Sequence, residues 1–436
     1  MKISFTQCCV PSAVKKFLYA LVICSMLIPK QDIFAQGDGF LTKEGKRLFP
    51  LGIYEFPKTQ EELKAMAEAG INLIRCGNRE DLDRAASVGL MGWLPIAVNN
   101  GPTDDLRRKI ESVVDHPALA VWEGPDEIVW NFTAYSGLYR ENKVYKQSGE
   151  WWLQTPLVIG YSEGQAKEVI PRMKEGINLV RRLDTHNRQF WINEARDSDL
   201  KFIRQYIDFV DITGCDHYPV GRVQRDAYKL GASTERFKQI GRGKPVWMVL
   251  QAFSWHELGD SYVDRGVAYP TFDESRLMAY DCIARGARGI FYWGSMFLKS
   301  GEFRESLYAL TGEMAQLQPF LTAPDERNVH VQVIEGRGGQ KDSSEYLNQS
   351  VVITVRRTER EWLIILVNET GIMQYGVEVG GLDDLNGMDF YQLYGDETVT
   401  VNRGEFVTRM KPFGVKVFAT SRKWETDKRK GREFGQ

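Results

Sequence analysis

The sequence predicts an α/β protein, in which a (β/α)8 barrel is followed by a small antiparallel β-sandwich. Two patterns lead to this prediction. From residue 48 to residue 321, short β-rich runs alternate with amphipathic helical stretches, as in a parallel sheet with helical crossovers. After Pro324 the helical stretches stop, and β-rich runs are separated only by turns rich in Gly, Asn and Asp.

The first part of the chain contains eight β-rich runs, in the order 48–56, 71–77, 91–100, 119–127, 188–195, 209–220, 244–255 and 287–295. Helical runs separate them, and the first of these keeps Leu63, Met66 and Ala67 at helical spacing. Eight such units in roughly 270 residues have the size of a closed barrel. An open, doubly wound sheet also alternates strand and helix, but no Gly-rich turn follows the first run, and eight units favour closure.

These patterns divide the chain into four parts: a signal peptide over 1–36, the barrel over 37–323, the sandwich over 324–420 and a charged tail over 421–436. We expect the tail to be disordered because it is rich in charge and poor in apolar residues. We expect the chemistry in the barrel, and a packing or accessory role for the sandwich.

The first 36 residues carry the features of a secretory signal. Lys15-Lys16 precedes an apolar run from Phe17 to Pro29, and small or polar residues follow around Ala35. The run is too short for a membrane span. We therefore expect an exported protein (periplasmic, cell-surface or secreted) without a membrane span in its mature chain. A buried N-terminal helix is the alternative, and Pro11 and the basic flank argue against it.

Charge and motif content exclude several classes of protein. The 56 Lys and Arg nearly balance the 58 Asp and Glu, so nothing indicates a nucleic-acid-binding surface. Loss of residues 1–36 removes four lysines and one aspartate, which changes the formal charge from −2 to −5. The remaining Cys76, Cys215 and Cys282 suggest neither a metal site nor a disulfide framework. The histidines lack zinc-site spacing, so we expect no metal and no cofactor.

The stretch "LAVWEGPDE", residues 119–127, ends an apolar strand in three carboxylates, Glu123, Asp126 and Glu127. In a closed barrel the C-terminal ends of the strands carry the functional residues. The other strand ends add carboxylates, amides and aromatic rings, so that the candidate substrate-binding residues are Glu55, Arg75, Asn99, Trp122, Asp126, Glu194, His217, Tyr218, Gln251, Trp255 and Trp293. Rings stack on the C–H faces of sugars while carboxylates and amides bind their hydroxyls, so we predict a carbohydrate substrate.

This layout resembles glycoside hydrolase clan A, the retaining (β/α)8 glycosidases, over nearly the whole mature chain. Trp122 and Pro125-Asp126-Glu127 are similar to the clan's acid/base motif, with Asp126 in place of the usual Asn. "CDHYPV" is similar to its strand-six segment, and Trp293 in "GARGIFYWGS" to its strand-eight aromatic residue. The resemblance implies that Glu127 is the general acid/base.

Strand seven departs from the clan's pattern, because Gln251 stands where a nucleophilic Glu is expected and an amide cannot form a glycosyl ester. The candidates for the second catalytic carboxylate are other acidic residues near the strand ends: Glu257, Asp216, Glu55 and Glu194. A carboxyl about 5–5.5 Å from Glu127 would retain the anomeric configuration, and one about 6.5–9.5 Å away would invert it.

Crowding of Asp126 and Glu123 near Glu127, with Trp122 and Trp130 restricting water, is expected to raise at least one carboxyl pKa. A general acid needs such a pKa near neutral pH. We therefore predict an exported glycoside hydrolase of polysaccharides or oligosaccharides with Glu127 as general acid. The alternatives are a degenerate barrel that binds carbohydrate without hydrolysing it, and a barrel enzyme with a non-sugar substrate.

Several candidates also have structural interpretations. The acidic residues of 123–127 suit a helix N-terminus, His217 suits a buried hydrogen-bonded position, Trp293 can fill the barrel top, and Arg75 can pair with a rim carboxylate. An insertion over 128–163, rich in Tyr and Trp, is expected to overhang the active-site face, either as a substrate-contacting wall or as a hydrophobic subdomain packed on itself.

Overall fold

The computed structural model describes residues 37–259, 266–335, 350–427 and 429. The predicted signal peptide, 1–36, lies outside the described residues. The predicted disordered tail lies outside them only in part, since residues 421–427 pack on the molecule. There Trp424 lies edge-on to Phe320, with ring centroids 4.8 Å apart, and Glu425 accepts a hydrogen bond of 2.9 Å from the backbone N–H of Tyr394.

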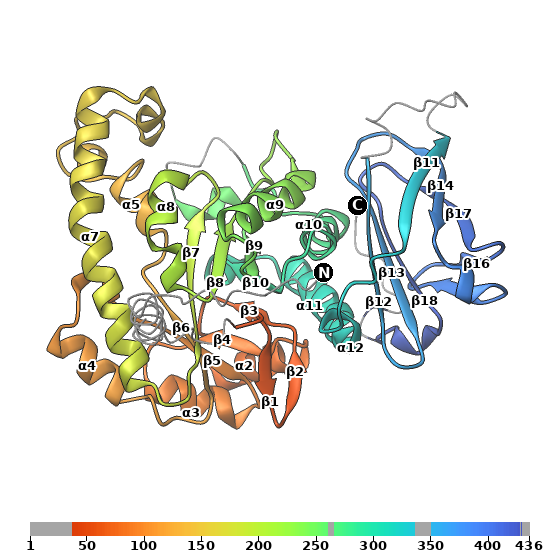
Figure 1. Cartoon of the computed structure of the whole chain (residues 1–436), viewed down its shortest axis with the longest axis horizontal. Coiled ribbons are helices and arrows are strands. Elements are labelled where there is room, and N and C mark those ends of the chain that lie inside the picture. Colours follow the sequence, from red (N-terminus) through yellow and green to blue (C-terminus); the bar gives the residue numbers. More distant parts are fainter. Residues whose placement is uncertain (1–36, 260–265, 336–349, 428, 430–436) are drawn as a thin grey trace, which may run out of the picture. The chain divides into compact units, whose positions relative to one another are not determined.

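Eight parallel strands close into a barrel, as the sequence predicts (Figure 1). In order around the barrel they are β3 (Leu51–Ile53), β4 (Leu73–Arg75), β5 (Met91–Pro95), β6 (Leu119–Glu123), β7 (Gln189–Ala195), β8 (Ile212–Asp216), β9 (Val246–Gln251) and β10 (Gly289–Trp293). The last strand pairs with the first, which closes the sheet. A short hairpin, β1 (Leu41–Lys43) with β2 (Lys46–Leu48), precedes the barrel.

Helices connect successive strands and cover the outside of the barrel. They are α2 (Gln60–Glu68), α3 (Arg79–Ser87), α4 (Asp104–Glu111), α7 (Pro156–Leu183), α8 (Leu200–Tyr206), α9 (Leu230–Ile240), α10 (Phe272–Ala284) and α11 (Gly301–Gln316), with the short α12 (Gln318–Leu321) after the last. Capping boxes begin two of them: Thr59 with Glu62 at α2, and Thr271 with Glu274 at α10. None of the helices in the described part of the chain is long and apolar enough to cross a membrane.

Aromatic rings fill the barrel interior. Trp93, Trp191, Trp247 and Phe291 are fully buried there, with Phe291 stacked on Trp191 and Trp247 at centroid distances of 5.2 and 4.8 Å. Gly52 of β3 makes room for them, because a Cβ at this position would lie 2.4 Å from the Phe291 ring. The packed interior holds the C-terminal strand ends in fixed positions.

Two antiparallel sheets form the C-terminal sandwich. One contains β11 (His330–Glu335), β14 (Gln374–Gly380) and β17 (Glu405–Met410), and the other β12 (Val351–Arg357), β13 (Trp362–Asn368), β18 (Val415–Ala419), β15 (Asp389–Gln392) and β16 (Thr398–Thr400). Apolar side chains from both sheets share one core. The predicted fold class, a barrel followed by a β-sandwich, is confirmed.

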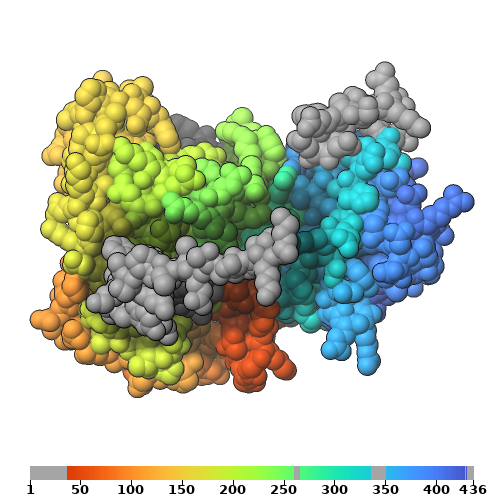
Figure 2. All heavy atoms as spheres, viewed as in Figure 1, coloured from red at the N-terminus to blue at the C-terminus, as the bar shows by residue number. Residues whose placement is uncertain are grey.

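The insertion after β6 is more helical than the sequence suggested. It begins with α5 (Ile128–Phe132) and α6 (Gly137–Arg140), and its last residues already belong to α7. Trp151 is buried against Phe202 of α8 at a centroid distance of 6.5 Å, whereas Trp152 is 52% exposed. The outer surface of this segment is drawn in yellow in Figure 2. Within the insertion, Trp151 therefore packs on a neighbouring helix whereas Trp152 faces solvent.

Candidate active site

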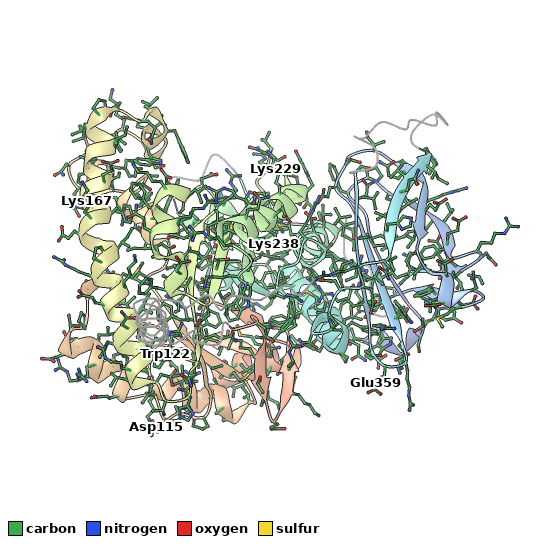
Figure 3. All side chains as sticks on the ribbon, in the orientation of Figure 1. Asp115, Trp122, Lys167, Lys229, Lys238 and Glu359 are labelled. Carbon is green, nitrogen blue, oxygen red and sulfur yellow. The ribbon has the colours of Figure 1, made fainter. Side chains whose placement is uncertain are left out.

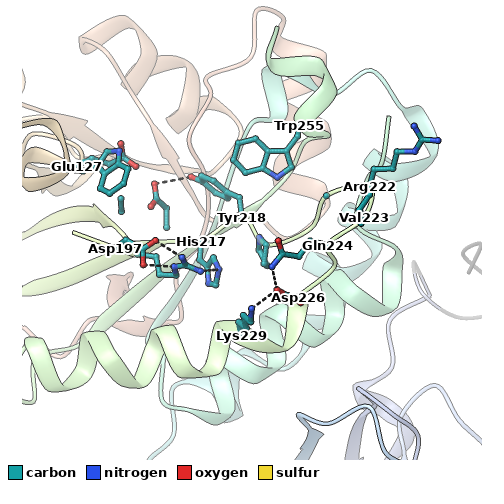
Figure 4. A pocket seen from close by; sticks show the side chains of 16 residues that line it. Glu127, Asp197, His217, Tyr218, Arg222, Val223, Gln224, Asp226, Lys229 and Trp255 are labelled. Carbon is teal, nitrogen blue, oxygen red and sulfur yellow. Dashed lines mark hydrogen bonds and ion pairs between the residues drawn. The ribbon is translucent and has the colours of Figure 1, made fainter. Parts of the chain in front are cut away.

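A cavity of about 650 Å³ opens at the C-terminal ends of β6, β7, β8 and β9 (Figure 4). Five residues that the sequence indicates lie in its wall: Glu127, Asp216, His217, Tyr218 and Trp255. The wall also contains Trp130, which the sequence analysis placed beside the carboxylates, and residues that it did not select, namely Arg196, Asp197, Arg222 and Lys229. Arg196 and Asp197 directly follow β7, and this position is the signal that could have identified them.

The backbone at Glu127 has an uncommon left-handed conformation, with φ 50° and ψ 40°. Hydrogen bonds hold it in place: its N–H donates to the carbonyl of Asn193 at 2.9 Å, and its carbonyl accepts from the N–H of Asn131 at 2.8 Å. Such strained positions cluster at functional sites. This turn precedes α5 and places the side chain of Glu127 in the cavity wall.

Glu127 and Asp216 form a hydrogen-bonded carboxyl pair at the cavity wall. Such a bond requires that one carboxyl carries a proton. Burial raises the pKa of Asp216 well above its ordinary value, and the charge of Glu127 adds to this effect. Burial also raises the pKa of Glu127. The pair therefore keeps one proton at pH values where isolated carboxyls have lost theirs.

Asn193, on the neighbouring β7, connects the acidic residues of the rim. Its amide donates to Asp126 at 3.0 Å and to Asp216 at 3.3 Å. Burial raises the pKa of Asp126 as well. The direction of these shifts is the one that the crowding of acidic residues in the sequence suggests.

Glu123 lies deeper in the barrel and is fully buried. It accepts hydrogen bonds from Arg75 Nε at 2.7 Å and from the indole N–H of Trp93 at 3.2 Å. Burial outweighs the Arg75 charge and raises the pKa of Glu123 to about 7. Of the two interpretations of Arg75, pairing with a rim carboxylate is therefore the one the structure contains.

His217 lies against Arg196 in the cavity wall. Arg196 donates to its Nε2 at 3.1 Å, so the proton is on Nδ1, which donates to the Ser233 hydroxyl at 2.9 Å. Burial and the Arg196 charge lower the pKa of His217 to about 3, so the ring is neutral. Arg196 is also paired with Asp197 through two nitrogens. His217 thus fixes Arg196 at the cavity wall.

Aromatic rings line the site beside the carboxyl pair. Tyr218 stacks on Trp293 with centroids 5.3 Å apart, contacts Trp255 edge-on at 6.4 Å, and donates its hydroxyl hydrogen to Asp216 at 3.3 Å. Trp255 and Trp130 face the cavity directly. Trp293 therefore supports the ring of Tyr218, which lies in the cavity wall.

Trp122 and Glu194 point away from the cavity, contrary to the expectation that both bind substrate. Trp122, labelled in Figure 3, is fully buried and donates its indole N–H to Asp184 at the end of α7 at 2.8 Å. Glu194 accepts from the N–H of Val129, from the Ser198 hydroxyl at 2.8 Å and from the Tyr206 hydroxyl at 2.7 Å. Successive side chains of a strand face opposite sides, and these two face the helices.

Gln251 does not face the cavity; its side chain is hydrogen-bonded to the backbone of two neighbouring segments. It is fully buried, its carbonyl oxygen accepts from the N–H of Val220 at 3.0 Å, and its amide donates to the carbonyls of Val220 and Phe253 at 2.8 and 3.0 Å. A carboxylate could not make the last two bonds. The amide at this position has a packing reason, because it ties the loop after β8 to the end of β9.

The remaining candidates lie around the rim. Glu257 accepts a hydrogen bond from the Tyr269 hydroxyl in the loop after β9, and Glu55 accepts from the N–H groups of Gly294 and Ser295 at 2.6 and 3.1 Å. Asn99 is half-buried in the short 3-10 helix Val98–Asn100. In the described ranges, no three His, Cys, Asp or Glu side chains are placed to hold a metal ion.

The fold and site define a (β/α)8 barrel protein with a C-terminal β-sandwich and an acidic, aromatic-walled cavity at the C-terminal ends of its strands. In sequence, no protein-family model and no curated protein matches the chain.

Several solved structures are similar in fold. A glycoside hydrolase family 5 protein from Bacteroides vulgatus matches 87% of this chain and 90% of its own, with a TM-score of 0.50 and 13% identity. A β-galactosidase from Bacillus circulans matches 86% of this chain and 99% of its own, with a TM-score of 0.50 and 8% identity. A β-galactosidase from the psychrophilic Marinomonas ef1 matches 62% of this chain, at 16% identity and a TM-score of 0.43, and the alignment spans only 60% of that enzyme. The predicted clan A-like architecture is confirmed as a fold.

Proposed function

We propose that this protein is a glycoside hydrolase in which Glu127 is the general acid. The observation that carries the proposal is the Glu127–Asp216 pair in the cavity wall, whose carboxyls are both shifted toward the protonated form. Cleavage of a glycosidic bond requires a proton for the leaving oxygen. The fold similarity to glycoside hydrolases supports the same substrate class.

In this mechanism the cavity residues have distinct tasks. The rings of Trp130, Trp255 and Tyr218 stack on the sugar, and Arg196 donates to its hydroxyls. Glu127 delivers the proton. Asp216, whose pKa is raised the more strongly, holds the shared proton until the substrate arrives. The proton then passes through Glu127 to the leaving oxygen, and the negative charge left on the pair lies next to the developing positive charge of the sugar ring.

Asp216 is the proton partner of Glu127 and not the attacking group in this proposal. A carboxyl that keeps its proton is a poor nucleophile, and burial raises the pKa of Asp216 well above its ordinary value. Asp126 is the better candidate for the second carboxylate, because Asn193 holds it at the same rim. Glu257, by contrast, is engaged by Tyr269.

The test is hydrolysis of a panel of plant, algal and microbial glycans by the wild-type protein and by Glu127→Gln. We expect released sugar from at least one glycan, and a roughly 10²–10⁴-fold lower rate in the variant. Glu175→Gln, on the exposed side of α7, is the matched control and keeps the wild-type rate. A Glu127→Gln protein that cleaves at the wild-type rate would contradict the proposal.

Carbohydrate binding without hydrolysis is a second candidate, favoured by one observation. Gln251 occupies the strand-seven position with an amide that is fully engaged by backbone groups. Under this function the wild-type protein binds a glycan from the panel, releases no sugar from it, and binds it equally well after Glu127→Gln.

We also propose that the protein is exported and that residues 1–36 are removed on the way. The support is the basic, apolar and small-residue order of this segment. Mass spectrometry of the mature protein is expected to give an N-terminus near Gly37, and a full-length mature chain would refute export by this signal.

A further inference from the structure

The exposed large apolar side chains of the barrel lie at one end of it. Seven of them belong to the loops that lead from the C-terminal end of a strand to the next helix, called the mouth loops below, and Leu157 in the first turn of α7 is the eighth. Those in the mouth loops after β6, β8, β9 and β10 are Tyr135, Val144, Trp152, Leu153, Val223, Val267 and Met296. In the described part of the chain, the loops at the opposite end of the barrel carry none.

These side chains project into water. Val223 is 94% exposed, and Leu153 and Met296 are each 70% exposed. Arg222, next to Val223, points away from the other labelled side chains of the cavity (Figure 4). Single exposed apolar residues are common on protein surfaces, but a random scatter would not confine them to the mouth. Apolar side chains gathered on one side of a molecule indicate a surface that binds a partner.

Positive charge prevails among the exposed residues of the mouth loops. In their described part, the exposed charged residues are the acidic Glu141 and the basic Lys58, Arg140, Lys143, Lys146, Arg222 and Lys299. Two of the basic residues directly precede apolar tips, since Val144 follows Lys143 and Val223 follows Arg222. Further acidic residues of this end lie in the first turns of α2, α3 and α4, where they favour the helix dipole. The tips of the loops thus combine apolar side chains with basic ones.

The chemistry of these side chains fits a lipid bilayer better than a polysaccharide or a protein. Sugar rings are recognised through aromatic faces, but Tyr135 and Trp152 are the only aromatic residues in this exposed apolar set. Protein interfaces are depleted of lysine. Aliphatic side chains gain free energy when they leave water for the acyl region of a bilayer, while lysine and arginine keep their charged ends at the head groups. Anionic lipids attract such basic segments, and tryptophan prefers the membrane interface.

We propose that the mouth loops bind a lipid bilayer that contains anionic lipids. Leu153 and Val223 enter the boundary between head groups and acyl chains. Lys143, Lys146 and Arg222 lie among the anionic head groups. The same loops build the wall of the cavity at the strand ends, so a docked molecule opens this cavity toward the head groups. Such binding is peripheral and requires no hydrolase activity.

The test is sedimentation of the protein with lipid vesicles. The chain used begins at Gly37, because the apolar run from Phe17 to Pro29 would itself bind lipid. Gly37–Gln436 is a compact unit that contains the whole barrel and sandwich. We expect binding to mixed vesicles of phosphatidylcholine and phosphatidylglycerol, and weaker binding to vesicles of phosphatidylcholine alone. Added salt is expected to weaken binding to the mixed vesicles, because it screens the charges.

A pair of double variants tests the apolar tips. Leu153→Ser with Val223→Ser removes two exposed side chains, and we expect it to weaken binding to the mixed vesicles about tenfold or more. Tyr375→Ser with Val407→Ser is the matched control, because these residues of the sandwich are also exposed, at 44 and 47%. It is expected to bind as the wild-type protein does. Thermal unfolding at the wild-type temperature shows that both variants are folded.

A second pair tests the basic residues. Lys143→Glu with Lys146→Glu reverses two charges of the mouth loop after β6, and we expect it to weaken binding to the mixed vesicles about tenfold or more. Lys46→Glu with Lys64→Glu makes the same change at exposed positions outside the mouth loops, and is expected to keep most of the binding.

The inference is overturned if the wild-type protein does not bind the mixed vesicles, or if the sandwich variant loses as much binding as the mouth-loop variant. It is also overturned if the mouth loops have another occupant. Sedimentation with an insoluble polysaccharide such as cellulose, but not with vesicles, would identify a glycan surface. A dimer in light scattering that Leu153→Ser with Val223→Ser dissociates would identify a second copy of the chain.

Discussion

The proton shared by Glu127 and Asp216 depends on where the chain places two acids from different strands. Glu127 reaches the cavity through a left-handed turn after β6, and Asp216 ends β8. Asp216 is the more deeply buried partner, and the negative charge of Glu127 further disfavours its ionisation. The more accessible carboxyl can therefore give up a proton that the buried one helps to retain.

Asp216→Asn is expected to move the alkaline limb of the kcat/KM profile to lower pH. The variant removes the carboxyl that holds the shared proton, and the Asn amide can only donate to the Glu127 carboxylate, so the proton of the site is lost earlier as pH rises. The measurement is the pH profile on a cleaved glycan from the panel. Asp197→Asn, a cavity residue paired with Arg196, leaves the position of the limb unchanged. A limb that stays in place in Asp216→Asn would remove the pair from the mechanism.

The sequence predicts which strand ends carry functional residues better than which side chains face the cavity. Glu127, Asp216, Tyr218 and Trp255 are found where the C-terminal rim of a barrel requires them. Trp122 does not face the cavity although it adjoins Glu123, because neighbouring residues in a strand point to opposite faces. Applying the two-residue period to β6 would have excluded it.

At the level of elements, the loop after β8 is held in place by one side chain. Gln251 makes three hydrogen bonds to backbone groups of Val220 and Phe253. This loop follows His217 and Tyr218, so its position sets the cavity wall. Such a role is not visible in the sequence, where Gln251 only marks a missing carboxylate, because its partner Val220 lies 31 residues away along the chain.

Gln251→Glu is therefore expected to destabilise the protein and not to restore activity. Two buried carbonyls lose their donor, at about 1–3 kcal/mol each, and a charge is placed in a fully buried position. Denaturant unfolding measures the loss, and Gln205→Glu, on the exposed side of α8, changes stability by less than about 0.5 kcal/mol. Increased hydrolysis by Gln251→Glu would show instead that a nucleophile was lost here.

The insertion after β6 contains aromatic side chains whose environment could not be predicted from the sequence. Its aromatic content suggested either a substrate wall or a packed subdomain, and the structure contains both: Trp130 lines the cavity, while Trp151 packs on α8. Long-range contacts decided the outcome for each ring. Residue type alone does not distinguish them, because both are tryptophans in a polar-aromatic stretch.

At the scale of the whole molecule, the barrel and the sandwich are joined by a surface that is buried on both sides. Ile364 and Leu366 of β13 face the sandwich core, whereas Leu363 and Ile365 belong to the apolar cluster of the barrel. This explains the continuous apolar run "WLIILV", which an exposed sheet face would not need. The sequence shows the run, but only the docked structure shows why it is apolar on both faces.

Asp281 of α10 holds a proton at this junction. It is fully buried, accepts from the N–H of Gly231 at 2.7 Å and hydrogen-bonds to Glu369, which Arg285 pairs through two nitrogens at 2.8 and 2.6 Å. Burial raises the pKa of Asp281 well above its ordinary value, and the charge of Glu369 adds to this. The protonated acid is thus the donor that links α10 to the end of β13.

Because the pKa of Asp281 is higher in the folded than in the unfolded protein, the native state binds the proton more tightly. The stabilisation of the native state by this proton is complete below the ordinary aspartate pKa of about 4 and is lost as pH rises through the pKa of the folded protein. Asp281→Asn keeps both hydrogen bonds without a titrating proton, since its oxygen accepts from Gly231 and its amide donates to Glu369. We therefore expect the free energy of unfolding of Asp281→Asn, relative to wild type, to increase from pH 5 to pH 8 in denaturant titrations. Asp384→Asn, on an exposed turn, is expected to follow the wild-type pH dependence. If Asp281→Asn also follows the wild-type curve, the two parts are not joined by a proton at Asp281.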